Sequence, residues 1–172
     1  MRIIFLIICM LSSNAFSEEQ TFGSWRVDSL EYNGVIISFA NTTNESGSTL
    51  GVMCTSDSSV CAPYLLNGLT CEEDGSYPAL VGVDDGIASI KMSCVHIADN
   101  HMFVLPDEHL EYLISMNRYS VAFGVSGGRF KAAYFTLNGS AKAVIAARSL
   151  VNVERSNKGN KKKVNIYQDN YL

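Results

Sequence analysis

The sequence lacks an apolar run long enough to cross a membrane as a helix. Such a helix needs about 20 apolar residues, and the longest run here, residues 3–11, is roughly half that length. This run follows Arg2, and the small residues Ala15 and Ser17 after it fit a signal-peptidase site. We predict a secretory signal peptide at residues 1–17, cleaved before Glu18, no transmembrane segment, and a periplasmic or secreted protein. A lipidated Cys9 is the weaker alternative, since Ile8 is larger than the residue that usually precedes such a cysteine.

The motifs of common catalytic and metal-binding sites are also missing. "LNGSAKA", around Gly139, lacks the second glycine of a nucleophile elbow, and "CEEDGS" lacks the ligand spacing of a calcium loop. His96, His101 and His109 are of a type that binds zinc, copper or nickel, but their polar surroundings indicate surface histidines. We therefore predict no catalytic residue, no metal site and no cofactor. A pair of carboxylates that meets only in space stays open.

Cysteines are few after the signal peptide: Cys54, Cys61, Cys71 and Cys94. An even set in an exported chain indicates two disulfides, and no C-x₂-C spacing supports zinc instead. The strand-like "LGVMC" and "CAPYLL" flank the polar loop "TSDSSV", so a hairpin would bring Cys54 opposite Cys61. Cys71 would then pair with Cys94.

Basic residues are scarce in the body of the chain. Residues 18–150 contain 7 Lys/Arg against 15 Asp/Glu, whereas residues 151–172 contain 5 against 2. An acidic body argues against a nucleic-acid partner. The end of the chain is polar, basic and without an amphipathic period, so we predict a flexible tail at 151–172. A weak contact of this tail with anionic surfaces is an open alternative.

Short runs of β-branched and aromatic residues between polar breaks indicate strands. The runs are "FGSWRV", "GVIISFANTT", "TLGVMC", "CAPYLL", "ASIKMSCV", "YSVAFGV" and "RFKAAYFTL". Asn33-Gly34 predicts a tight turn, and "DDG" at residues 84–86 and "SGG" at 126–128 predict two more. The sequence thus predicts one mainly β domain at residues 18–150, an antiparallel sandwich or barrel-like fold.

Two stretches have helical character. "PDEHLEYLISM" begins with Pro106 and acidic residues, and its predicted buried stripe is Leu110, Leu113 and Ile114.

A C-terminal capping helix is predicted after "FTLNG". Gly139 permits the sharp change from strand to helix, and Asn138 or Ser140 is the candidate N-cap. The residues expected to face inward at helical spacing are Ala141, Val144, Ile145 and Leu150.

Three features resemble the invasion-associated locus B family of small exported bacterial proteins. They are "GSWRV", cysteines spread through the first half, and the late segment "RFKAAYFTLNGSAKAV". That segment is similar to the family's ending, a strand F-x-L-x-G that enters a small-residue helix. The matching positions are Phe135, Leu137, Gly139, Ala141 and Ala143. The resemblance implies a secreted β-rich fold without an established enzymatic activity.

These observations predict an exported, disulfide-bonded binding protein that acts in the bacterial envelope or outside the cell. Its partner would be a protein or envelope component, met through a few exposed aromatic residues. Two alternatives are a periplasmic inhibitor or immunity protein, and a cell-wall or glycan hydrolase.

Overall fold

The structure is a computed structural model that describes residues 20–58, 60–84, 86–97, 100–125 and 129–168. The predicted signal peptide at 1–17 and the predicted turn at 126–128 lie outside the described residues, as does Asp85 of "DDG". No helix in the described part of the chain is both long and apolar enough to span a membrane.

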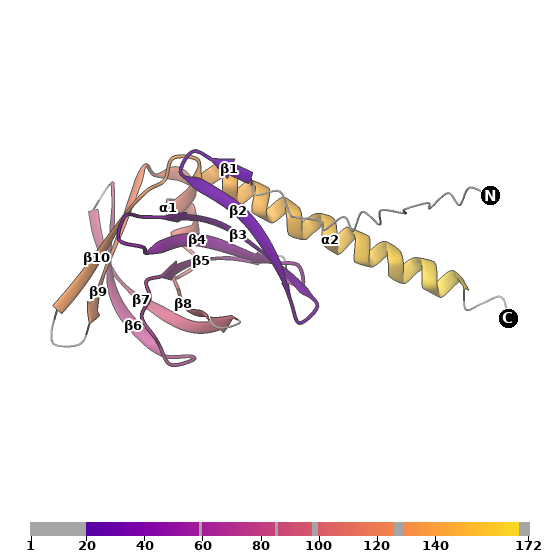
Figure 1. The fold of residues 1–172 in the computed structure, drawn as a ribbon, viewed down its shortest axis with the longest axis horizontal. Helices are drawn as coiled ribbons and strands as arrows, with labels where there is room; N and C mark the ends of the chain where they lie inside the picture. The colour runs from indigo at the N-terminus through magenta and orange to yellow at the C-terminus, as the bar shows by residue number, and fades with distance from the viewer. Residues whose placement is uncertain (1–19, 59, 85, 98–99, 126–128, 169–172) are drawn as a thin grey trace, which may run out of the picture.

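Ten antiparallel strands form one curved sheet in the order β1-β2-β3-β4-β5-β8-β7-β6-β9-β10 (Figure 1). The strands are β1 (Gln20–Phe22), β2 (Trp25–Tyr32), β3 (Val35–Thr43), β4 (Thr49–Thr55), β5 (Cys61–Leu66), β6 (Ser76–Val83), β7 (Gly86–Ile97), β8 (Asn100–Val104), β9 (Arg118–Val125) and β10 (Arg129–Thr136). The two helices are α1 (His109–Ser115) and α2 (Ser140–Gln168). The predicted mainly β class, with a C-terminal helix, is confirmed.

Residues that adopt a positive φ form the turns of the first two hairpins. Asn33 and Gly34 have φ of 51° and 75°, and Tyr32 pairs with Val35, so they form the predicted two-residue turn between β2 and β3. "FGSWRV", predicted as one strand, is instead a hairpin corner. Gly23, with φ of 61°, directly follows β1 and lets the chain reverse into β2 at Trp25.

Strand β6, "SYPALVGV", was missed by the sequence analysis. A proline within a run argues against an interior strand because it has no N–H to donate. In the structure β9 pairs with β6 only from Ala79 onward, so Pro78 stands where β6 has one neighbouring strand, β7.

The sheet curls until β10, its last strand, approaches the start of β2 and the β3–β4 turn near the opposite edge. The indole Nε1 of Trp25 donates to the Thr136 carbonyl (3.2 Å), and the Asn44 amide donates to the Tyr134 carbonyl (3.2 Å). The Ser24 backbone N–H donates to the Asn138 carbonyl (3.2 Å). The first two bonds use the outer edge of β10, and the three together give the sheet its barrel-like closure around a core that includes Trp25.

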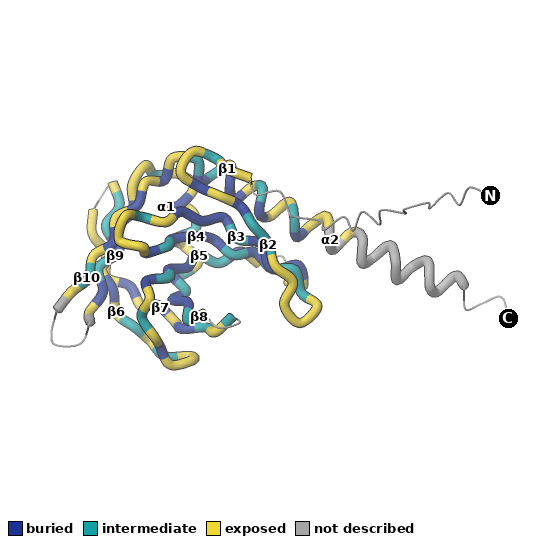
Figure 2. Tube along the Cα trace, in the orientation of Figure 1, coloured by how far each residue is buried: buried dark blue, intermediate teal, exposed yellow. Residues whose placement is uncertain are grey.

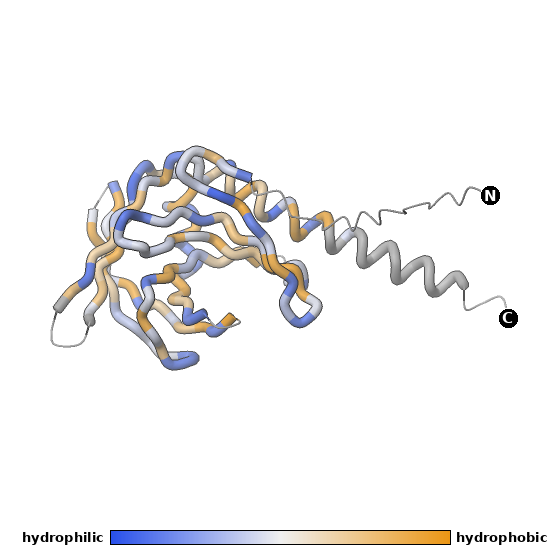
Figure 3. The backbone as a smooth tube through the Cα atoms, viewed as in Figure 1, coloured by the Kyte–Doolittle hydropathy of each residue, from blue (hydrophilic) through white to orange (hydrophobic). Residues whose placement is uncertain are grey.

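Helix α2 covers β2 and β3 with its first turns and runs on past the sheet (Figure 1). The stripe that faces the sheet is buried and made of small residues: Ser140, Ala143, Val144, Ala147 and Val151. Ser38 of β3 donates its buried hydroxyl to the Ala147 carbonyl (2.6 Å), which requires close approach of helix and strand. Figure 2 shows this buried side of α2, and Figure 3 shows hydrophilic residues gathered in the turns.

Two sequence expectations about α2 need correction, the residues on its inward face and its N-cap. Ile145 is exposed and Ala141 and Leu150 are only half-buried, because the small residues Ala143 and Ala147 allow the closest approach to the sheet. The helix begins at Ser140, and Gly139 accepts the first helical bond from the Ala143 N–H (3.0 Å).

Gly139, rather than Asn138 or Ser140, therefore occupies the N-cap position. The backbone is helical to Gln168, so α2 continues into the predicted tail at 151–172. The flexibility of 151–172 stays a prediction.

Helix α1 is shorter than the stretch "PDEHLEYLISM" that the sequence predicts as helical, since it begins only at His109. Leu113 is buried as predicted, Leu110 is half-buried, and Ile114 is exposed, so the predicted stripe holds only in part. A buried histidine, His109, joins Leu113 on the inner side.

Candidate functional site

The two disulfides lie in the scaffold. Cys54 and Cys61 are directly opposite in the β4–β5 ladder with Cα atoms 4.1 Å apart, and they are bonded. Cys71, in the loop before β6, is bonded to Cys94 of β7 with Cα atoms 6.0 Å apart. Each disulfide joins one fully buried cysteine to one that is 7% exposed. The structure thus bonds the pairs that the sequence favoured.

The three histidines do not form one site. His96 and His101 face each other across the β7–β8 hairpin, with ring centroids 4.2 Å apart. His109 lies elsewhere, buried in α1, with its Nδ1 hydrogen-bonded to the Tyr119 hydroxyl (2.7 Å). Burial lowers the pKa of His109 despite the opposing charge of Glu108, and burial raises the pKa of Tyr119. His109 and Tyr119 therefore form a neutral, structural pair near pH 7.

An unusual surface lies on the side of β6, β7, β9 and β10 that faces away from the core. Along β10 the side chains alternate, so that Ala133 and Phe135 are buried while Phe130 and Tyr134 are 74% and 72% exposed. Ile87, at the start of β7, is 80% exposed. A single exposed apolar side chain is common, but several large ones on one side of neighbouring strands are characteristic of interaction surfaces. We call this surface the outer face.

The floor of the outer face is made of small residues. Across the β9–β10 ladder, Tyr134 is opposite Ser120 and Phe130 is opposite Gly124. Across the β6–β9 ladder, Ser120 is opposite Gly82. The Ser120 hydroxyl donates to the Gly82 carbonyl (3.3 Å), and a Cβ on Gly82 would stand only 2.5 Å from that hydroxyl. Because Gly82 has no side chain, the floor stays low between the larger side chains.

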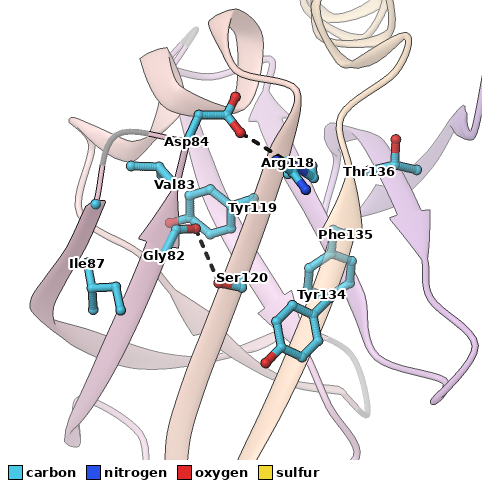
Figure 4. A pocket seen from close by; sticks show the side chains of 11 residues that line it. Gly82, Val83, Asp84, Ile87, Arg118, Tyr119, Ser120, Tyr134, Phe135 and Thr136 are labelled. Atoms are coloured by element: carbon cyan, nitrogen blue, oxygen red, sulfur yellow. Dashed lines mark hydrogen bonds and ion pairs between the residues drawn. The ribbon is translucent and has the colours of Figure 1, made fainter.

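A pocket of about 560 Å³ opens over this floor, with Ile87 and Tyr134 on opposite sides of Ser120 (Figure 4). Its polar end holds Asp84 and Arg118, whose carboxylate and guanidinium lie 3.7 Å apart. The second oxygen of Asp84 accepts the Asn117 N–H (3.0 Å). Asp84 is the one carboxylate among the described lining residues, and it is already engaged on both oxygens.

A second hollow, of about 520 Å³, lies on the other side of β10 toward the β3–β4 turn. It is lined by Asn44 and neighbouring polar residues and shares Tyr134, Phe135 and Thr136 with the first. Tyr134 therefore stands between two hollows, where its ring can contact a ligand in either.

Comparison with known proteins finds a solved structure whose fold is similar to that of this chain. No protein-family model matches the chain, and no curated protein matches its sequence. Among solved structures, the chain is similar to the crystal structure of invasion associated protein B from Bartonella henselae. The two share a fold. The TM-score is 0.54 at 16% identity, over 78% of this chain and 97% of invasion associated protein B.

This likeness confirms the resemblance drawn from "GSWRV" and "RFKAAYFTLNGSAKAV" at the level of the fold. The outer face was not identified from the sequence. The alternation in "RFKAAYFTL" placed exposed and buried residues on opposite faces of β10, but nothing local placed Ile87 and Gly82 beside them.

Proposed function

We propose that the protein is an exported, disulfide-bonded binding protein that acts in the bacterial envelope or outside the cell. Its binding site is the outer face, and its ligand is a protein or envelope component that presents apolar or aromatic groups. The observation that carries this proposal is the exposure of Tyr134 and Phe130 beside a floor of Gly82, Ser120 and Gly124.

The energetics favour a role in recognition. Each aromatic side chain removes about 150–250 Å² from water when it is buried, at roughly 25 cal/mol per Å². Tyrosine loses little conformational freedom on binding and keeps a hydroxyl for a hydrogen bond, so it is frequent in interfaces. A low floor between Tyr134 and Ile87 lets a flat or extended group lie against the strands.

The pocket gives less support to the hydrolase alternative. Glycoside hydrolysis takes two carboxyl groups with separate roles. Asp84 is the one carboxylate among the described lining residues, and it already contacts Arg118 and the Asn117 N–H, so no such pair of carboxyl groups is described there.

The test compares three forms of the mature protein, wild type, Tyr134→Ala and the matched control Ile145→Ala. Ile145 is 67% exposed on α2, so its loss removes exposed apolar surface away from the outer face. Each form is immobilised, exposed to envelope extract from the source organism, and the captured partner is purified and titrated. We expect Tyr134→Ala to weaken binding at least about fivefold, as interface anchors do, and Ile145→Ala to leave it unchanged.

Equal binding by wild type and Tyr134→Ala would contradict the assignment to the outer face. A captured effector that loses its activity when bound would make the protein an inhibitor. Release of soluble fragments from purified cell-wall glycan by the wild type would favour the hydrolase instead.

Export is part of the same proposal and has its own measurement. Mass spectrometry of the protein from its native source should find a chain that begins at Glu18. A retained Met1, or a lipid on Cys9, would contradict a cleaved secretory signal.

A further inference from the structure

Four side chains of metal-binding types converge at the second disulfide. The ligand atoms of Cys71, Cys94, His96 and His101 all lie within 4.8 Å of one another. Within the described residues this is the one group of three or more His, Cys, Asp or Glu side chains that is placed to hold a metal ion. The Cys54–Cys61 disulfide, with the same burial, has no such group around it among those residues.

The cluster is built by three segments. Cys94 and His96 are two residues apart on β7 and therefore on the same side of the strand, and His101 lies opposite His96 on β8. Cys71 enters from the loop before β6, and its carbonyl is 3.1 Å from both His96 Nε2 and His101 Nδ1. The two sulfurs are buried while the imidazoles lie further out.

The loop is held in place by more than the disulfide. The Cys94 N–H donates to the Gly75 carbonyl (3.1 Å), and the Asp74 N–H donates to the Cys94 carbonyl (3.1 Å). The Tyr77 hydroxyl accepts the Glu72 N–H (2.7 Å). These bonds do not depend on the S–S bond, so they keep Cys71 close to Cys94 when that bond is open.

Two thiolates and two imidazoles are the donor set of tetrahedral structural zinc sites. With Zn–S distances of about 2.3 Å, the two sulfurs of such a site lie about 3.8 Å apart, a separation the open dithiol reaches by side-chain rotation. In the disulfide, neither sulfur is a thiolate, so only the imidazoles are left to bind. The oxidation state of one cysteine pair therefore decides whether the full donor set exists.

We propose that Cys71, Cys94, His96 and His101 form a metal site that opens on reduction and takes one Zn²⁺. A dithiol reductant supplies two electrons and two protons by thiol–disulfide exchange and becomes a disulfide itself, while Cys71 and Cys94 become thiols. Zn²⁺ then displaces the two thiol protons and binds both sulfurs and both imidazoles. Exchange with a disulfide oxidant reverses the sequence: the oxidant takes up the two electrons and two protons and becomes a dithiol, the Cys71–Cys94 bond forms again, and Zn²⁺ is released.

The test uses the full mature chain, with Co²⁺ as a spectroscopic probe for Zn²⁺. Protein reduced with a phosphine, and oxidised protein as the reference, are titrated with Co²⁺. We expect the reduced form alone to show the d–d and thiolate charge-transfer bands of tetrahedral cobalt, saturating at one metal per chain and removed by Zn²⁺. His96→Ala and His101→Ala should each weaken binding by more than about tenfold, the loss that even outer-shell changes around a metal cause.

Two matched variants separate this site from non-specific thiol binding. His109→Gln changes a buried histidine outside the cluster, and the double variant Cys54→Ser with Cys61→Ser removes the other disulfide. Both should keep the cobalt bands, whereas Cys71→Ser with Cys94→Ser should lose them. Bands that survive loss of His96 and His101 would overturn the proposal, because thiolates alone would then account for them.

Folding is followed in the same samples. If reduction unfolds the chain, Zn²⁺ must restore the native circular dichroism and raise the melting temperature, because metal binding is coupled to formation of the site. A reduced protein that stays unfolded in Zn²⁺, or a folded one that takes up no metal, would overturn the proposal.

Discussion

The backbone of Gly139 packs directly against the carbonyl group of Phe22, where the last strand turns into α2. Gly139 has φ of 94°, and a Cβ at this position would overlap the Phe22 carbonyl. Gly139→Ala should therefore destabilise the fold through both backbone strain and overlap, by more than the roughly 1–3 kcal/mol of strain alone. Denaturant unfolding measures the change.

The matched control for this prediction is Gly47→Ala. Gly47 also has a positive φ, 77°, but a Cβ there would meet nothing within 4 Å. Gly47→Ala should therefore lower the free energy of unfolding only by the cost of backbone strain. If the two variants are equally destabilised, the contact between Gly139 and Phe22 contributes nothing.

Ala143 should not tolerate a large side chain. It is fully buried where α2 meets the sheet, so Ala143→Leu forces the helix away from β3 and should cost about 1–3 kcal/mol. Lys142→Leu places the same side chain one residue earlier, on the exposed side, and should be nearly neutral. Thermal unfolding of both variants checks the prediction. A neutral Ala143→Leu would contradict the close packing of α2.

The Cys71–Cys94 disulfide should contribute more stability than Cys54–Cys61. Their sequence separations are 23 and 7 residues, while their burial is alike. In the chain-entropy model, the longer loop contributes about 3.4 kcal/mol and the shorter about 2.4 kcal/mol. Double Cys→Ala variants of each pair, unfolded in denaturant with a chelator present, measure the two losses. A larger loss for the short loop would show that native-state contacts outweigh loop entropy.

Stability should fall as pH drops below about 6.5, with His109 as one cause. Burial lowers the pKa of His109 below its ordinary 6.5, and Tyr119 bonds its Nδ1. The unfolded chain therefore takes up this proton before the folded chain does, so stability present at neutral pH is lost between 6.5 and the lower folded pKa. His109→Gln should reduce the change in the free energy of unfolding over this pH range. Unfolding free energies between about pH 7 and pH 5 give the slope, and an unchanged slope would contradict the assignment.

The sequence by itself determined the elements whose chemistry is local. Asn33-Gly34 produced its turn because both residues tolerate positive φ, and alternation in "RFKAAYFTL" separated the buried and exposed sides of β10. Cys54 and Cys61 pair because the hairpin between them is short. The same local reasoning misplaced Ile145, since the choice of the inward side of α2 depends on how closely Ala143 and Ala147 approach β3.

Only the tertiary structure decided which residues come together in the outer face and in the cluster of two cysteines and two histidines. The outer face combines Ile87 of β7, Gly82 of β6, Ser120 of β9 and Tyr134 of β10, which become neighbours through strand order. Likewise, the two-residue spacing of Cys94 and His96 puts those two on one side of a strand, but no spacing in the sequence places His101 and Cys71 beside them. The β7–β8 pairing and a hydrogen-bonded loop bring His96, His101 and Cys71 together, because long-range register, unlike a turn, is set by the whole sheet.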